Sequence, residues 1–271
     1  MSRTTAEVEA VVADPSGTLL ALDFDGTLAH VVDDPEMAFA HAHAVDALAR
    51  LGPLLGQIAI ITGRPVRQAL ELGGFVGRPG FESLVVCGQY GAERWDAATG
   101  ETPEPDHPEA VRILADCLPQ WLAERGADHV RVEDKGLAVA VHTRGLEDGL
   151  LDELAGPLEA LAAEHGLTVE PGRQVVELRA PGPDKGEALE RLAEEVAARH
   201  IVFAGDDLGD LPAFDAVDRL RSNGLGGLLV CSASDEQDAL VARADLVLDG
   251  PDAVAVWLGG LADALDAGQA S

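Results

Sequence analysis

The apolar run at residues 19–22 limits how this chain folds more than any other feature, because none of its positions is polar. A strand with one face in water alternates apolar and polar side chains, whereas a strand covered on both faces does not. The run therefore predicts a buried strand of a parallel sheet. Asp23 and Asp25 follow it directly, ahead of Gly26 and Thr27. Ligands of open α/β sheets bind at the carboxyl ends of the strands, so we expect a functional site here.

Similar apolar runs alternate with helical patterns at both ends of the chain. The expected strands are residues 19–22, 58–61, 84–86, 201–204, 228–230 and 246–248, and the expected helices are residues 42–55, 65–72, 185–199 and 211–220. This alternation favours a parallel sheet wound with right-handed crossovers. The predicted fold class is α/β, with a doubly wound parallel sheet.

The middle of the chain follows a different pattern. A helix is expected at residues 109–125, followed by two alternating runs joined at Asp134-Lys135-Gly136. A second helix is expected at residues 148–165, followed by two runs joined at Pro171-Gly172. A helix and a hairpin, twice over, predict an α+β unit with an antiparallel sheet. We therefore expect a core of residues 1–92 and 182–271 and an inserted domain of residues 93–181.

Composition excludes several classes of protein. With 47% hydrophobic residues the chain is not disordered, and no apolar run reaches the length of a membrane span. A formal charge of −29 disfavours nucleic acids and anionic membranes as partners. Glu7 and Glu9 interrupt the region where an export signal needs an apolar core, so the expected location is the cytoplasm. Oligomeric state does not follow from the sequence.

Lysine is rare in this chain, which carries nearly all its positive charge on arginine. The two lysines are Lys135 and Lys185. An ammonium is a compact point charge and a guanidinium is a planar fork, so a site that requires the former resists exchange. We expect a function for Lys185 above all.

Three further polar segments lie at the carboxyl ends of core strands or open a helix: ITGR at residues 61–64, DKGEAL at residues 184–189 and FAGDDLGD at residues 203–210. With the first strand, they bring together Asp23, Asp25, Thr62, Lys185, Asp206, Asp207 and Asp210. Crowded carboxylates repel each other unless a cation shares the site. A hard cation that prefers oxygen ligands is implied, and Mg²⁺ is the usual one beside phosphate.

These segments resemble the motifs of the haloacid dehalogenase superfamily of phosphatases. The motifs appear in order as Asp23-x-Asp25-Gly26-Thr27, Thr62-Gly63, Lys185-Gly186 and Gly205-Asp206-Asp207. An insertion between the second and third motifs corresponds to the larger, C2 type of cap domain in that superfamily.

The insertion is similar to that of trehalose-6-phosphate phosphatases, in the segments VEDKGLAVAVHTR, GRQVVELRAPGPDKGEAL and CGQYGAERW. Two segments depart from the family pattern. Gly88-Gln89-Tyr90-Gly91 stands where Gly-x-His-Gly is common, a position that the resemblance links to the sugar. In the pattern Gly-Asp-Asp-x-Thr-Asp-Glu, Gly209 and Leu211 replace the Thr and the Glu. The first carboxylate of the pattern, that of the metal ligand Asp206, is kept.

The resemblance implies a role for each site residue. Asp23 is the nucleophile that forms an aspartyl-phosphate, and Asp25 is the general acid and then the general base. Thr62 and Lys185 hold phosphate oxygens. The Mg²⁺ ligands are Asp23, the backbone carbonyl of Asp25, Asp206 and, as an outer ligand, Asp210. The substrate-binding residues are Gly26, Gly63 and Arg64 in the core, and Glu133, Lys135, His142, Arg144 and Glu177 in the cap, which grip a disaccharide phosphate.

Some alternatives stay open at this point. Asp207 and Asp210 either reach the metal through water, brace Lys185, or cap the helix that starts near Leu211, since Asp is a favoured N-cap residue. Another sugar phosphate is an alternative substrate, because the fold does not determine it. From a different class, a phospho-receiver signalling module also combines acidic residues, a Thr and a Lys at strand ends. Such a module needs neither Asp25 nor an inserted cap.

Overall fold

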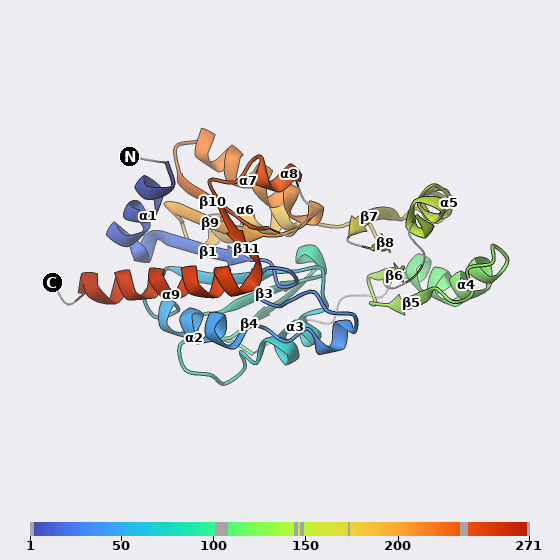
Figure 1. Cartoon of the computed structure of the whole chain (residues 1–271), viewed down its shortest axis with the longest axis horizontal. Helices are drawn as coiled ribbons and strands as arrows, with labels where there is room; N and C mark the ends of the chain where they lie inside the picture. Colours follow the sequence, from blue (N-terminus) through green and yellow to red (C-terminus); the bar gives the residue numbers. More distant parts are fainter. Residues whose placement is uncertain are drawn as a thin grey trace. The chain divides into compact units, whose positions relative to one another are not determined.

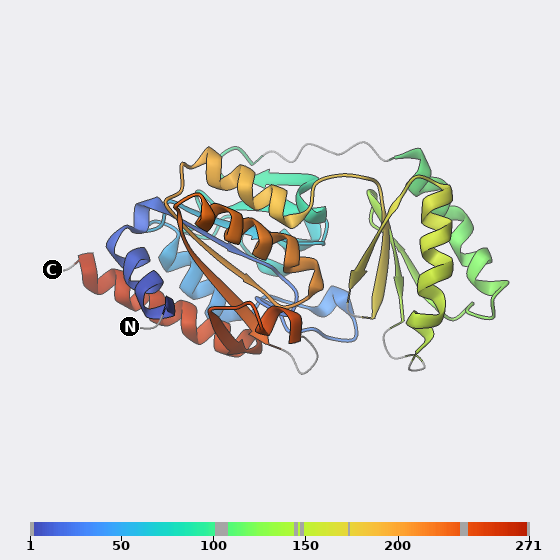
Figure 2. The ribbon, with the colours of Figure 1, turned by 90° about the horizontal axis from the view of Figure 1, so that it is seen from above.

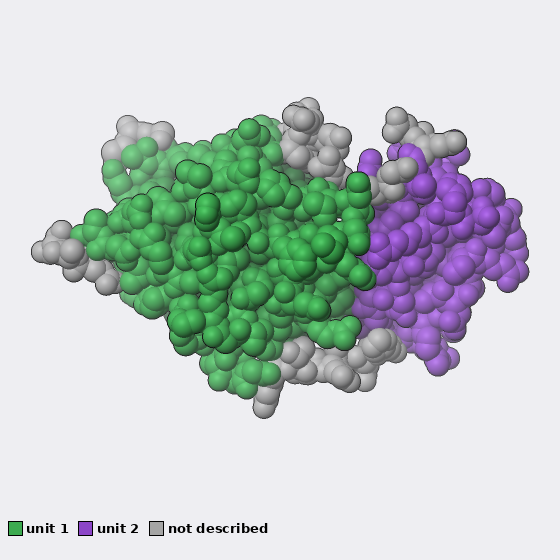
Figure 3. Space-filling view, turned by 60° about the horizontal axis from the view of Figure 1, so that its bottom comes forward, with its two compact units in different colours: residues 1–103, 183–271 green, residues 104–182 purple. Residues whose placement is uncertain are grey.

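The structure is a computed structural model of the 271-residue chain, and it describes residues 3–100, 108–143, 146, 149–172, 174–233 and 238–269. The chain divides into two compact units (Figure 3). Unit 1 comprises Met1–Pro103 and Pro183–Ser271, and unit 2 comprises Glu104–Gly182. The predicted site residue Arg144 lies outside the described residues.

Unit 1 is built on a seven-stranded sheet with the order β11-β10-β9-β1-β2-β3-β4. Its strands are β1 (Thr18–Leu22), β2 (Gln57–Ile61), β3 (Val85–Gly88), β4 (Glu93–Asp96), β9 (His200–Gly205), β10 (Gly226–Ala233) and β11 (Leu246–Asp249). All neighbours are parallel except β4, which runs antiparallel to β3. The prediction of an α/β fold with a mostly parallel sheet is confirmed.

Helices cover both faces of this sheet (Figure 1). They are α1 (Arg3–Ala13), α2 (Ala42–Leu51), α3 (Val66–Gly73), α6 (Lys185–Glu195), α7 (Leu211–Ser222), α8 (Asp238–Val241) and α9 (Gly250–Gln269), with short 3₁₀ turns η1 (Pro15–Gly17), η2 (Pro35–Met37), η3 (Gln89–Gly91) and η4 (Leu208–Asp210). Leu20 and Leu22 of β1 pack on the side of α1, α2, α3 and α9. Leu19 and Ala21 pack on the side of α6, α7 and α8. Burial of alternate residues in two cores explains why β1 is apolar throughout.

The strand order places the site. From β1 the chain proceeds to β2 and β3 on one side, and it later returns to β9, β10 and β11 on the other. The direction of winding therefore reverses between β1 and β9, and such a switch point is where open α/β sheets bind ligands. Asp23 follows β1 and Asp206 follows β9, on adjacent parallel strands.

The first boundary of the inserted unit differs from the prediction. Residues 93–96 form β4, whose Trp95 pairs with Val86 and is buried in the core of unit 1. Residues 93–103 therefore belong to unit 1, and unit 2 begins at Glu104 instead of residue 93. A four-residue strand with three polar residues gives little apolar signal, because only one of its side chains is buried.

Unit 2 repeats the order helix, strand, strand. Its elements are α4 (Glu109–Ala123), β5 (Arg131–Asp134), β6 (Ala138–His142), α5 (Leu150–Glu164), β7 (Thr168–Gly172) and β8 (Val175–Arg179). The strands form an antiparallel sheet of order β5-β6-β8-β7. Both helices pack on one face of it (Figure 2). The predicted hairpins are present, but Pro171 and Gly172 pair with β8 as part of β7 instead of forming the turn.

Within the described ranges, no helix is both long enough and apolar enough to cross a lipid bilayer.

Candidate active site

A buried ammonium connects the first and last motifs of unit 1. The Nζ atom of Lys185 lies 2.7 Å from Oδ1 of Asp23 and 2.8 Å from Oδ1 of Asp210. All three residues are buried. Asp23 is placed by its backbone N–H, which donates to the carbonyl of Ala204 (2.8 Å). Lys185 is the first residue of α6, where the side chain of Asp184 caps the helix by accepting from the N–H of Glu187 (2.8 Å).

The loop after β9 is held in shape by its own carboxylates. Oδ2 of Asp210 accepts from the N–H of Asp206 (2.9 Å) and from the N–H of Asp207 (3.2 Å). Asp207 in turn accepts from the N–H of Gly209 (2.8 Å) and forms a capping box with Asp210 at the start of η4. Of the alternatives considered for this pair, Asp210 braces Lys185, and both residues cap the 3₁₀ turn that precedes α7.

Three carboxylates form a group with the dimensions of a cation site. One oxygen from each of Asp23, Asp206 and Asp210 lies within 4.8 Å of the other two. None of the described residues hydrogen-bonds the buried carboxylate of Asp206. A buried carboxylate with no protein donor is costly, and several such oxygens suit a hard divalent cation. The donor set therefore fits the metal expected from the sequence.

The pKa directions agree with this interpretation. Burial raises the pKa of Asp23 well above its usual value, and the nearby carboxylates of Asp210 and Asp207 act in the same direction while Lys185 opposes them. Burial, followed by Asp207 and Asp23, also raises the pKa of Asp206. Burial and the Asp210 carboxylate raise the pKa of Asp207 to about 6. The single ammonium of Lys185 does not compensate the negative charge of these buried carboxylates, whereas a bound cation would compensate it.

Gly26 allows the first motif to approach the acidic group. Its backbone has φ +71°, and a Cβ atom at this position would lie 1.9 Å from Oδ2 of Asp206. Only glycine fits such a turn without displacing the carboxylate. The carbonyl of Gly26 accepts from the hydroxyl of Ser232 (2.6 Å), a buried residue of β10. Ser232 was not expected, because nothing in its local sequence distinguishes it from an ordinary strand residue.

The second motif supplies a hydroxyl and a guanidinium. Oγ1 of Thr62 accepts from the N–H of Arg64 (3.1 Å), which leaves the hydroxyl proton of this buried residue available to an acceptor. Arg64 was expected to bind substrate. Its side chain donates from Nε and Nη2 to the two carboxylate oxygens of Asp25, at 2.6 Å each, and from Nη1 to the carbonyl of Pro35 (2.9 Å), and the substrate contact stays a prediction. The sequence does not reveal this pair, because the two residues belong to different motifs.

In unit 2 the predicted residues form two pairs on one sheet face. Lys135 forms an ion pair with Glu177. Nε2 of His142 lies 2.9 Å from Oε2 of Glu133, and this hydrogen bond lowers the pKa of Glu133 against the opposing effect of burial. Glu133 and Glu177 both pair with Ala140 of β6, so their side chains point to the same face, opposite the helices.

Glu177 has an unsatisfied oxygen. The residue is 4% exposed, and its Oε2 atom has no hydrogen-bond partner among the described residues. A buried acceptor of this kind is available to a ligand hydroxyl.

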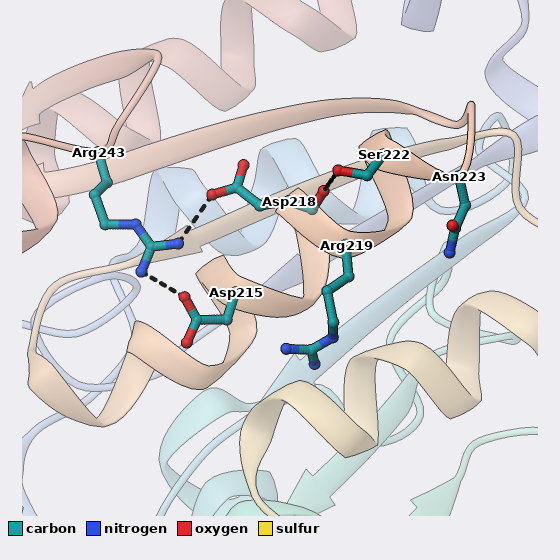
Figure 4. Close-up of a pocket in the computed structure, with 6 residues that line it drawn as sticks. All are labelled: Asp215, Asp218, Arg219, Ser222, Asn223 and Arg243. Atoms are coloured by element: carbon teal, nitrogen blue, oxygen red, sulfur yellow. Dashed lines mark hydrogen bonds and ion pairs between the residues drawn. The ribbon is translucent and has the colours of Figure 1, made fainter.

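A separate hollow of about 530 Å³ lies along the C-terminal half of α7 (Figure 4). It is lined by Asp215, Asp218, Arg219, Ser222, Asn223 and Arg243. Arg243 donates to Asp215 (2.6 Å) and to Asp218 (2.9 Å), and Arg219 donates to Glu190 (2.8 Å). The charged side chains that line the hollow are thus already paired, Arg243 with two lining residues and Arg219 with Glu190 outside the lining, and none of them belongs to the acidic group at Asp23.

Comparison with known proteins agrees with this geometry. Residues 21–245 match the sequence model of the trehalose-phosphatase family. The chain belongs to this family. A trehalose-phosphate phosphatase of Mycolicibacterium paratuberculosis is 32% identical over 254 residues, which cover 91% of this chain and 62% of that protein. The chain thus spans about 62% of the length of this curated relative.

Solved structures of low sequence identity share the fold. The C-terminal domain of a trehalose-6-phosphate phosphatase from C. albicans is 21% identical, with a TM-score of 0.80, and the match covers 97% of this chain and 98% of that chain. A haloacid dehalogenase-like hydrolase from Bacteroides thetaiotaomicron is 17% identical, with a TM-score of 0.59 over 90% of this chain and 99% of that chain. The predicted haloacid dehalogenase-like fold is confirmed.

Proposed function

We propose that this chain hydrolyses trehalose 6-phosphate to trehalose and inorganic phosphate. The observation that carries the proposal is the Lys185 bridge between Asp23 and Asp210, in a chain of the trehalose-phosphatase family. Beside this bridge lies the carboxylate of Asp206, which no residue of the described ranges hydrogen-bonds. The relative from Mycolicibacterium paratuberculosis carries the name trehalose-phosphate phosphatase, and this supports the same substrate for this chain.

In the proposed reaction an oxygen of Asp23 attacks phosphorus, and the bond from phosphorus to the sugar oxygen breaks. The product of this step is an aspartyl-phosphate, which water then hydrolyses to restore the carboxylate and release phosphate. Lys185 holds the attacking carboxylate in place, and it neutralises charge on the phosphoryl oxygens together with the hydroxyl of Thr62. Gly26 and Gly63 let the backbone approach these oxygens closely.

Asp25 transfers the protons. It gives one to the departing sugar oxygen and later takes one from the attacking water. Both of its oxygens accept hydrogen bonds from Arg64, and each oxygen keeps a second lone pair that can carry the proton. Arg64 thus positions Asp25 in our proposal.

Mg²⁺ is the proposed cation. Asp23, Asp206 and the backbone carbonyl of Asp25 would hold it, with Asp210 as an outer ligand. When bound, the ion allows the carboxylate and the phosphate, both anions, to approach each other. Asp210 acts mainly through Lys185 and the loop amides, since both of its oxygens already accept hydrogen bonds there.

The polar sheet face of unit 2 is proposed to bind the sugar. A disaccharide presents many hydroxyl groups, which donate to carboxylates and accept from an ammonium. Glu133, Lys135, His142 and Glu177 supply such groups, and the unsatisfied Oε2 of Glu177 is the clearest acceptor. Arg144 stays a prediction from the sequence, as do the absence of nucleic-acid partners and the cytoplasmic location.

The test is release of phosphate from a panel of esters, with Mg²⁺ and with EDTA. The panel contains trehalose 6-phosphate, sucrose 6-phosphate, glucose 6-phosphate and acetyl phosphate. We expect many turnovers, dependence on Mg²⁺ and the highest kcat/KM on trehalose 6-phosphate. Preference for another ester would replace the substrate. Incorporation that stops at one phosphoryl group per chain would favour the receiver module.

A further inference from the structure

Two consecutive residues in η3 have an uncommon backbone. Gln89 has φ 48° and Tyr90 has φ 60° and ψ 21°, both in the left-handed region that residues other than glycine seldom occupy. The turn is fixed by two hydrogen bonds to the second motif: the N–H of Gln89 donates to the carbonyl of Arg64, and the N–H of Tyr90 to that of Thr62, both at 2.9 Å. Conformations of this kind persist where the surroundings impose them, and they cluster at functional sites.

The strained turn places the ring of Tyr90 beside the phosphate-binding motifs. A Cβ atom on Gly63 would lie 2.9 Å from both Cζ and the hydroxyl oxygen of Tyr90. A Cβ atom on Gly209 would lie 3.8 Å from Cε1 of the same ring. The ring therefore lies between Thr62-Gly63 and the Asp207–Asp210 loop, in space that the missing side chain of Gly63 leaves open.

The two departures from the family pattern meet at this point. Tyr90 stands where the pattern has His, and Gly209 stands where it has Thr. A Cβ at residue 209 would lie at van der Waals distance from the ring, and a threonine adds a methyl and a hydroxyl beyond that Cβ. We expect these groups to crowd the ring of Tyr90. The larger side chain at residue 90 is thus matched by the missing side chain at residue 209.

We propose that Tyr90 is a specificity-determining residue, which contacts the sugar next to the phosphate and which Gly209 allows into that position. The inference rests on the proposed function. Tyr90 is partly buried and adjoins the residues assigned to the phosphoryl group, so the next atoms of the substrate lie within its reach. A phenol suits a sugar, because its ring packs on C–H groups and its O–H exchanges hydrogen bonds with hydroxyls.

Kinetics of Tyr90→Phe and Tyr90→Ala test the contact. On trehalose 6-phosphate we expect KM to rise about threefold to tenfold for the Phe variant, the effect of one hydrogen bond, and further for the Ala variant. The ratio of kcat/KM on the sugar phosphate to that on acetyl phosphate should fall with each step. An unchanged ratio in both variants would overturn the proposal.

A double-mutant cycle tests the match with Gly209. Gly209→Thr should lower the same ratio in the wild-type background and have little effect when Tyr90→His is also present. Gly209→Ala is the control for crowding of the loop, because its Cβ would lie 3.1 Å from Oδ1 of Asp207, a tight contact that the Thr variant shares, but 3.8 Å from Cε1 of Tyr90, an ordinary van der Waals distance. Additive effects of the Thr and His substitutions would contradict the match.

A spectroscopic readout is possible because Tyr90 is the only tyrosine of the chain. Protein that contains 3-fluorotyrosine and the inactivating substitution Asp23→Asn should give ¹⁹F signal from this residue alone. Trehalose 6-phosphate should shift the signal saturably, and further than inorganic phosphate does. Equal shifts would mean that the ring senses only the phosphate, and no shift would mean no contact; either result overturns the proposal.

These outcomes are distinguishable from failure of the proposed function. If the wild type prefers another sugar phosphate, the substrate assignment fails, and the Tyr90 variants are measured on that ester. If the wild type hydrolyses no sugar phosphate, both proposals fail. If it hydrolyses trehalose 6-phosphate and the variants keep its selectivity, only the Tyr90 proposal fails.

Discussion

Arg64 holds the carboxylate of Asp25 in two parallel hydrogen bonds of 2.6 Å each. The side chain of Arg64 is 7% exposed and that of Asp25 is 39% exposed, so a buried guanidinium orients a carboxylate that solvent reaches. Paired, forked contacts of this kind are strong and directional. The proposed proton-transfer residue therefore has a defined resting position, set by a residue from another motif.

Replacing Arg64 by Lys should impair this positioning, since an ammonium offers no planar fork. We expect kcat to fall roughly tenfold to a hundredfold on trehalose 6-phosphate, less than the roughly hundredfold to ten-thousandfold that general acid–base catalysis contributes, because Asp25 itself is kept. The loss should be smaller on acetyl phosphate, because its leaving group departs without a proton. Steady-state rates on both esters provide the measurement. Equal losses would mean that Arg64 binds the phosphoryl group directly.

Asp23→Asn preserves the size of the proposed nucleophile and removes its charge. Turnover should vanish, because the amide neither attacks phosphorus nor binds a cation well. The fold should survive, since the hydrogen bond from the Asp23 backbone to Ala204 does not involve the side chain. Circular dichroism and phosphate release check the two halves of this prediction. Folded protein with more than trace activity would exclude Asp23 as the nucleophile.

Lys185 allows a prediction on both stability and rate. Burial alone lowers the pKa of this ammonium, but the carboxylates of Asp210, Asp23 and Asp207 more than offset it, and the pKa lies well above its usual value. Lys185→Met would leave buried carboxylates unpaired, at a cost of about 3–5 kcal/mol in the free energy of unfolding. Lys185→Arg keeps the charge but should still reduce activity sharply, because a guanidinium is larger than the space between two carboxylates. Denaturant titration and kcat measure the two effects, and normal activity of the Arg variant would contradict the special role of a lysine.

Addition of Mg²⁺ should stabilise the folded chain even without substrate. A cation at the carboxylates of Asp23 and Asp206 relieves the unfavourable burial that raises their pKa values. At a hundred times the Kd, binding contributes about 2.7 kcal/mol, which appears as a higher melting temperature. Asp206→Asn should remove most of this shift, and Asp252→Asn, a substitution of an exposed residue on α9, should keep it. An identical shift in both variants would place the ion elsewhere.

The sequence predicts the centre of the site better than its edges. The apolar run of β1 and the helices around it determine a parallel sheet, and a parallel sheet necessarily gathers Asp23, Thr62 and Asp206 at one edge. Side-chain pairs between distant motifs leave no such pattern. The contact of Arg64 with Asp25 and the fit of Tyr90 beside Gly209 depend on rotamers and on the path of loops, which periodicity does not encode.

The helix α9 was also not predicted from the sequence, although it is 20 residues long. Gly259 and Gly260 lower its intrinsic helix propensity. Its stability comes instead from Val254, Leu258 and Leu265, which are buried in the core beside α2. Packing against the core thus outweighs the low helix propensity of the two glycines. This packing is visible only in the assembled sheet and not in the local sequence.

The final prediction concerns Glu177 and the substrate. Its buried Oε2 has no hydrogen-bond partner among the described residues, so we expect it to accept from a sugar hydroxyl. Glu177→Gln keeps the shape but turns part of that acceptor into a donor and weakens the ion pair with Lys135. An unmatched buried polar group costs about 1–3 kcal/mol, which corresponds to roughly tenfold to a hundredfold in kcat/KM.

Selectivity is the quantity that separates sugar binding from a general defect. The ratio of kcat/KM on trehalose 6-phosphate to that on p-nitrophenyl phosphate should fall in Glu177→Gln, because the small ester has no disaccharide to bind. Asp134→Asn is the matched control: it also removes one carboxylate charge from the same sheet, at an exposed residue whose Oδ1 accepts from the N–H of Gly136 (2.8 Å). The control should keep the wild-type ratio. If Glu177→Gln slows both esters equally, the residue supports the fold of unit 2 and does not recognise the sugar, and the assignment of trehalose 6-phosphate would then depend on family membership alone.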